Sequence, residues 1–178
     1  LAAEHAFVID PVDGTRNFVQ GNPDHAVMVG ELRSGTVVRG WIWQPEHQVA
    51  FVSERGAGVT RNGVQLSPVA RTGVPRVESS SRRDLGALVD NPDWSVARTH
   101  FCCGIDYPRL ITGELDFLCY RSMFPWDHLA GGLMATELGG RIATDAGVDY
   151  QPGVIGRRLL TAANPQLWQT ARDALLGR

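Results

Sequence analysis

The sequence predicts a layered α+β fold in which an antiparallel meander comes first and an α/β portion follows. Residues 25–66 form short β-rich runs separated by turn residues, which is typical of a meander. From about residue 75 strand-like and helix-like segments alternate, which indicates a second layer with a parallel or mixed sheet. A chain of 178 residues can also bury a sizeable core. We expect two subdomains, residues 1–75 and 76–178, that share an interface.

The first portion opens with an apolar run at residues 6–9, which we expect to be a buried strand that Asp10 and Pro11 terminate. Asn62-Gly63 predicts a tight hairpin, because both residues of such a turn need positive φ. The meander strands are expected at 25–32, 36–44 and 48–54, with short strands around Val59 and at 64–66.

In the second portion the clearest helix is 127–138, where apolar residues recur at helical spacing and Gly139-Gly140 offers a C-terminal cap. Helix 105–112 accepts Pro108 near its first turn, and helix 165–176 begins with a proline. The remaining elements are a helix at 82–89 and strands at 77–79, 97–102, 115–118, 141–144 and 159–162.

Composition excludes several classes of function. The net charge of -2 without a basic stripe argues against a nucleic-acid polymer as partner, and no apolar run approaches the ~20 residues of a membrane span. Three cysteines without a C-x-x-C spacing indicate a reducing, cytoplasmic location. Adjacent Cys102 and Cys103 in THFCCG are interpreted as small core residues of a buried strand.

Two carboxylates crowd the turn in AFVIDPVDGTRNF. Pro11 holds Asp10 and Asp13 close together, and like charges so placed favour a cation between them. Oxygen ligands favour Mg²⁺ or Mn²⁺. Gly14 and Thr15 follow at the expected start of a helix, where free amides receive anions, so the pair predicts a phosphate site. The alternative is an ordinary Asp-Gly turn with solvated acids.

A second stretch, PWDHLAGGLMATELGG, places Asp127 at a helix start among small residues that allow close backbone approach. The alternative reading makes Asp127 a helix N-cap. His128, which follows it, is interpreted as a helix-surface histidine rather than as a ligand.

Together, DPVDGTRNF and WDHLAGG followed by ELGG resemble the signature motifs of the inositol monophosphatase family of metal-dependent, lithium-sensitive phosphatases. The resemblance runs from Phe7 to the C-terminus and includes SERGAGVTRNGVQL and LLTAAN. It implies the layered αβαβα sugar-phosphatase fold. Family members carry a helical segment and a Glu-Glu motif upstream of the first Asp; here Glu4 is the only acid before Asp10, so we expect the fold without that N-terminal segment.

The resemblance implies a role for each motif residue. Asp10 would bridge two Mg²⁺ ions, with the Val12 carbonyl and the Thr15 hydroxyl helping to hold the first. Asp13 and Asp127 would hold the second ion. The Gly14 and Thr15 amides would hold the phosphate, so the catalytic set is Asp10, Asp13, Thr15 and Asp127. Two or three Mg²⁺ ions, with Mn²⁺ as a substitute and inhibition by Li⁺, are expected.

The implied activity is hydrolysis of a small polyol, sugar or related phosphomonoester by metal-activated water, in a cytoplasmic homodimer. Histidinol phosphate or a nucleotide 3'-phosphate are alternative substrates, because Tyr120 and Arg121 stand where inositol-specific members tend to have an acid. Arg121 would bind a second anion or, by preference, be solvated. Asp106 lies near where relatives keep an acid beside the site.

Rival interpretations rest on related motifs. A haloacid dehalogenase phosphatase would separate its acids by one residue and use a lysine, and this chain has no lysine. A calcium loop fails because Val12 occupies a ligand position. A non-catalytic protein that binds a phosphate ligand for regulation stays open as an alternative of another class.

Overall fold

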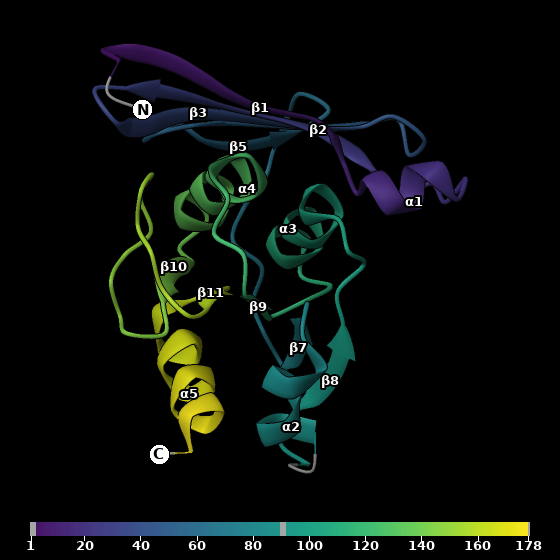
Figure 1. Cartoon of the computed structure of the whole chain (residues 1–178), viewed down its shortest axis with the longest axis vertical. Helices are drawn as coiled ribbons and strands as arrows, with labels where there is room; N and C mark the ends of the chain where they lie inside the picture. Colours follow the sequence, from purple (N-terminus) through teal and green to yellow (C-terminus); the bar gives the residue numbers. More distant parts are fainter. Residues whose placement is uncertain (1–2, 90–91, 178) are drawn as a thin grey trace.

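The structure is a computed structural model that describes residues 3–89 and 92–177. Figure 1 shows a stack of layers: one sheet, a pair of helices beneath it, a second sheet, and a second pair of helices. The first sheet has six antiparallel strands in the order β1-β2-β3-β4-β5-β6. The second has five strands in the order β10-β11-β9-β7-β8, with β7 parallel to both its neighbours. The expected meander and mixed sheet are therefore confirmed.

The first sheet is built from consecutive strands. They are β1 (His5–Asp13), β2 (Ala26–Arg33), β3 (Thr36–Gln44), β4 (Val49–Glu54), β5 (Gly58–Arg61) and β6 (Val64–Gln65). Asn62 and Gly63 have φ of 47° and 80°, as the hairpin between β5 and β6 requires. The short helix α1 (Thr15–Val19) lies between β1 and β2.

Strand β1 does not stop at Asp10 as expected. It continues through Pro11 to Asp13, with an irregular register against β2 between Asp10 and Asp13. A proline is tolerated here because β1 is the edge strand of its sheet and the register shift leaves the proline outside the ladder. The apolar side chains of Phe7 and Ile9 are about half exposed rather than buried.

The second half supplies both helix layers. Its elements are β7 (Arg76–Ser79), α2 (Arg82–Val89), β8 (Ser95–Arg98), α3 (Cys103–Thr112), β9 (Phe117–Tyr120), α4 (Pro125–Glu137), β10 (Arg141–Thr144), β11 (Leu159–Ala162) and α5 (Pro165–Leu176). The expected strand 97–102 is too long, because β8 ends at Arg98 and Cys102 is already the N-cap of α3. Most other boundaries agree with the prediction within two residues. The division into subdomains at residue 75 stays a prediction.

Two cores hold the layers together. One lies around α3 and α4, between the first sheet and one face of the second, and includes Met28, Ile42, Phe51, Tyr107 and Met134. The other lies between the second sheet and the helices α2 and α5, which Figure 1 shows on its far side. Helix α4 is therefore enclosed by protein on several sides. In residues 3–89 and 92–177, no helix combines the length and apolar character needed to cross a bilayer.

Candidate metal centre

Three aspartates meet at one edge of the first sheet. Asp10 and Asp13 come from β1, and Asp127 comes from the first turn of α4. One carboxylate oxygen from each can be chosen so that all three lie within 4.8 Å of one another. The structure thus brings together the three acids that the two sequence motifs predict.

Local hydrogen bonds shape the turn that carries the first two acids. The backbone N–H of Val12 donates to Asp10 Oδ1 at 3.0 Å, and the Thr15 hydroxyl donates to the Val12 carbonyl at 2.9 Å. Gly14 adopts φ of 75°, and a Cβ there would lie 3.0 Å from both the Asp24 carbonyl oxygen and Cys102 Cβ. A glycine is needed at this point because a side chain would meet both strain and crowding.

Asp13 is buried, and a second segment of the chain holds it. The N–H of Gly104, in the first turn of α3, donates to Asp13 Oδ2 at 2.6 Å, and the Cys102 thiol donates to the same oxygen at 3.0 Å. Burial raises the pKa of Asp13, while these hydrogen bonds and one from the Gly14 amide oppose the rise. The sequence analysis did not identify Gly104, because it lies 91 residues after Asp13 and no local pattern links the two.

Asp127 is not the N-cap of its helix. Phe124 takes the N-cap position and Pro125 the first helical position, so Asp127 is the third residue of α4. Its carboxylate is therefore available to the centre. Burial raises the pKa of Asp127 to about 7, and the negative charges of Asp13 and Asp10 add to the rise.

The donor set fits a divalent cation. All three side chains offer carboxylate oxygens, which Mg²⁺ and Mn²⁺ prefer, and their mutual repulsion is visible in the raised pKa of Asp127. A cation among them would remove that repulsion. Asp10, Asp13 and Asp127 are the residues that could hold it.

A buried polar network lies behind the centre. The Tyr120 hydroxyl and the His100 backbone N–H both donate to Asp106, the latter at 3.0 Å. Burial raises the pKa of Asp106 to about 7. Tyr120 therefore binds the acid that sequence reasoning placed near the site.

Two sequence interpretations are wrong. His128 is not on a helix surface: its side chain is fully buried, and burial lowers its pKa to about 3, so it is neutral. Arg121 is not simply solvated, because its Nε donates to the buried Asp84 at 2.6 Å. Arg158 pairs with the same carboxylate at 2.7 Å.

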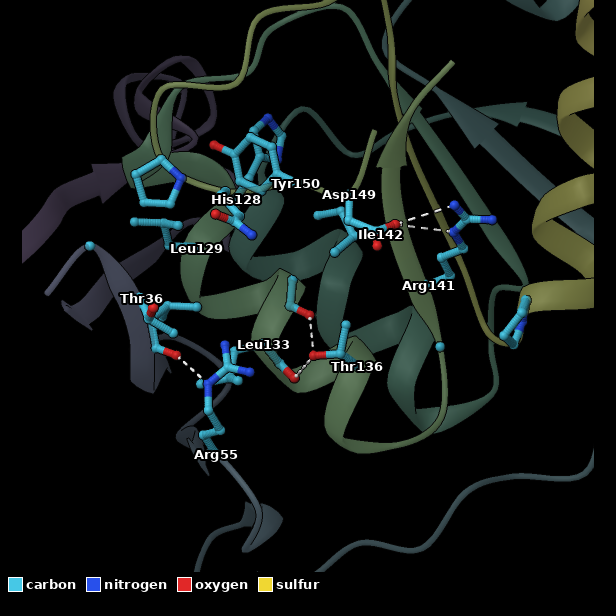
Figure 2. A pocket seen from close by; sticks show the side chains of 17 residues that line it. Thr36, Arg55, His128, Leu129, Leu133, Thr136, Arg141, Ile142, Asp149 and Tyr150 are labelled. Carbon is cyan, nitrogen blue, oxygen red and sulfur yellow. Dashed lines mark hydrogen bonds and ion pairs between the residues drawn. The ribbon is translucent and has the colours of Figure 1, made fainter. Parts of the chain in front are cut away.

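A cavity of about 570 Å³ lies beside α4 (Figure 2). Its walls come from α4, the β2–β3 hairpin and the segment around Tyr150 rather than from the three aspartates. Arg141 pairs with Asp149 at 3.2 Å on its edge, as Figure 2 shows. His128, which directly follows Asp127 in α4, and Tyr150 are among the residues that line the cavity.

Comparisons with known proteins place this geometry in context. The model of the inositol monophosphatase family matches residues 2–176. The putative Nus factor SuhB of Neisseria meningitidis serogroup B is 28% identical over 177 residues, covering 93% of this chain and 67% of that protein. The inositol-1-monophosphatase of Mesorhizobium japonicum is 28% identical over 185 residues, covering 93% and 70%.

Solved structures share the fold. The inositol monophosphatase from Anabaena superposes with a TM-score of 0.86 at 22% identity, covering 99% of this chain and 73% of that one. An IMPase/NADP phosphatase complexed with Mg²⁺ and phosphate gives a TM-score of 0.86 at 21% identity, covering 99% and 68%. The expected layered αβαβα fold is confirmed. This chain spans about two thirds of the length of the first curated relatives.

Proposed function

This chain belongs to the inositol monophosphatase family, and on that premise we propose that it hydrolyses small phosphomonoesters with divalent cations held by Asp10, Asp13 and Asp127. The family consists of phosphoric monoester hydrolases that use divalent metals. The observation that carries the proposal is the convergence of these carboxylates from β1 and α4.

Each residue at the centre has a defined task in the proposal. Asp10 would contact both of two cations, with the Val12 carbonyl and Thr15 hydroxyl beside it, while Asp13 and Asp127 would hold the second. The cations, when bound, polarise the phosphoryl oxygens and lower the pKa of a bound water. The Gly14 and Thr15 amides would orient the phosphate. The hydrogen bond between Thr15 and the Val12 carbonyl supports this assignment, because it already places both oxygens side by side.

The cation and the assembly follow the family. We propose Mg²⁺ as the working ion, Mn²⁺ as a substitute and Li⁺ as an inhibitor, in a cytoplasmic homodimer. A small polyol or sugar phosphate is the proposed substrate, which the names of the inositol-1-monophosphatase relatives support. Tyr120 stands where an acid would bind ring hydroxyls, and its own hydroxyl donates to Asp106, so histidinol phosphate and nucleotide 3'-phosphates belong in the same test.

A non-catalytic binding role is the second candidate. The observation in its favour is that a relative at 28% identity bears the name of a putative Nus factor. This candidate keeps cation and phosphate binding at the centre but expects no turnover.

The test is phosphate release from a panel of phosphomonoesters, with and without Mg²⁺, by the wild type and by Asp127→Asn. Asp127→Asn removes an anionic ligand, so we expect activity to fall by several orders of magnitude while the fold survives. Asp173→Asn, a substitution on α5 away from the centre, is the matched control and should stay active. Near-normal activity of Asp127→Asn would refute the assignment. Calorimetric Mn²⁺ binding without turnover would favour the second candidate.

A further inference from the structure

A second group of metal-ligating side chains lies against the aspartate centre. One ligand atom each from Cys103, Asp127 and His128 can be chosen so that all three lie within 4.8 Å of one another. Cys103 is the first residue of α3, and the other two lie in the first turn of α4. The group combines sulfur, oxygen and nitrogen donors, unlike the oxygen-only set of the centre.

Close packing of the two helices brings these residues together. At Gly131 of α4 a Cβ would lie 2.1 Å from the ring of Tyr107, one turn after Cys103 on α3. The absence of a side chain at Gly131 therefore lets the N-terminal turns of both helices approach. Cys103 and His128 are both buried and Asp127 only partly, so a cation between them would meet water on the Asp127 side alone.

The hydrogen bonds of His128 suit a metal ligand. Its Nε2 lies 3.1 Å from the Ser122 carbonyl, to which it donates in the neutral tautomer, and its Nδ1 then accepts from the Tyr107 hydroxyl at 3.0 Å. A backbone carbonyl on the far nitrogen is the usual partner of a metal-bound histidine, because it fixes the ring and the tautomer. A metal ion on Nδ1 would replace the hydrogen bond from Tyr107, so the Tyr107 hydroxyl oxygen must shift from Nδ1 toward Thr161 Oγ1, which lies 3.4 Å away.

We propose that Cys103, Asp127 and His128 form a second metal site that binds Zn²⁺ and, by engaging Asp127, competes with cations at the aspartate centre. Thiolate, imidazole and carboxylate are the ligands that Zn²⁺ takes, whereas Mg²⁺ avoids sulfur. From Zn²⁺ bond lengths, ligand atoms of a tetrahedral site lie roughly 3.5 Å apart, so ligand atoms at the 4.8 Å limit would need to approach by roughly 1 Å. Water completes the tetrahedron.

The binding step is balanced without an oxidant. The Cys103 thiol loses its proton to bulk water and becomes a zinc-bound thiolate, while His128 binds as the neutral ring. Asp127 cannot give the same carboxylate lone pairs to a cation in the second site and to one in the aspartate centre. Zn²⁺ at the second site is therefore expected to weaken Mg²⁺ binding, and only this last consequence rests on the proposed function.

The first test uses Co²⁺, which replaces Zn²⁺ and gives a near-ultraviolet charge-transfer band when it is bound to a thiolate. We expect the band in the wild type and its loss in Cys103→Ser. Cys119→Ser is the matched control, because Cys119 is a buried cysteine in the other core, on β9. Cys102→Ser tests the neighbouring thiol and should keep the band. A band that survives in Cys103→Ser, or that disappears in Cys102→Ser alone, would overturn the proposal.

A second variant covers the case in which Cys103→Ser does not fold. His128→Gln keeps the thiol but removes a proposed zinc ligand, and its Zn²⁺ affinity is measured in competition with a chelating dye. Loss of a hydrogen-bond partner outside the ligands weakens metal affinity by about 10–100-fold, so we expect a larger loss here. Unchanged Zn²⁺ affinity would contradict the site. In the phosphatase assay, Zn²⁺ should inhibit the wild type in competition with Mg²⁺, and Cys103→Ser should resist this inhibition. Equal inhibition of the wild type and Cys103→Ser would contradict the competition between the two sites. Absence of turnover would count against the proposed function and leave the Co²⁺ result unaffected.

Discussion

Replacing Gly131 with alanine should destabilise the fold and disturb the metal centre. The new Cβ would lie 2.1 Å from Tyr107 Cγ, 2.3 Å from Cδ2 and 2.7 Å from Cβ. Tyr107 is fully buried and cannot swing away, so α3 and α4 must separate. Overpacking of this kind costs about 1–3 kcal/mol. The higher helix propensity of alanine returns about 1 kcal/mol.

Gly132→Ala is the matched control because it lies in the same helix and gains the same propensity. Its Cβ would meet Ile142 Cδ1 at 2.9 Å, which is the movable end of a side chain. We therefore expect Gly131→Ala to be less stable than Gly132→Ala by about 1–3 kcal/mol, which lowers the melting temperature by about 2–12 °C.

Urea unfolding followed by circular dichroism measures this difference, and Mn²⁺ calorimetry measures its effect on the centre. Gly104 of α3 holds Asp13 by a hydrogen bond, so separation of α3 from α4 should draw Asp13 away from Asp127. The affinity for Mn²⁺ should therefore fall in Gly131→Ala and hold in Gly132→Ala. If Gly131→Ala proved as stable as Gly132→Ala, the close approach of the two helices would be wrong.

Three further predictions concern acids. Burial holds the pKa of Asp106 and Asp127 at about 7, so between about pH 4 and 7 the folded, metal-free protein keeps protons that the unfolded chain loses. The free energy of unfolding should therefore fall as pH rises through this range. Asp106→Asn should flatten the slope measured in urea titrations, and an unchanged slope would contradict this prediction. Mg²⁺ affinity, measured by calorimetry, should weaken as pH falls below 7, because Asp127 then gains a proton. Asp84→Ala should lower the free energy of unfolding in urea by about 1–3 kcal/mol, because it removes the shared partner of Arg121, which is partly exposed, and of Arg158, which keeps Asp145. An unchanged free energy of unfolding would refute the pairing.

The local signals in the sequence predicted most of the fold. Turn dipeptides such as Asn62-Gly63 fix a hairpin through backbone conformation alone, and the structure has it. Strand β1 was predicted too short because Pro11 is a strand breaker except at a sheet edge, and edge position is a property of the whole sheet. The segment 97–102 was predicted as strand because it contains a short apolar run, and such a run alone does not distinguish extended chain from a helix start.

The site was predictable only where its residues belong to motifs. Asp10, Asp13 and Asp127 converge as expected, whereas the burial of His128 was not predicted. Helix α4 is enclosed by neighbouring layers, so it is apolar on several faces and lacks the polar stripe by which a sequence reveals a solvent side. The pairing of Arg121 with Asp84 joins positions 37 residues apart, and no local pattern encodes such a contact.

The hydrogen bond from Gly104 to Asp13 spans 91 residues, and Asp127 arrives from still further along the chain. The centre can therefore assemble only in a molecule whose layers have already stacked. A fragment ending before α4 would contain two of the three carboxylates, however well its meander folded. Divalent cations bound at the centre, as proposed, would stabilise the folded protein alone, and this effect would grow with cation concentration because the unfolded chain has no equivalent site.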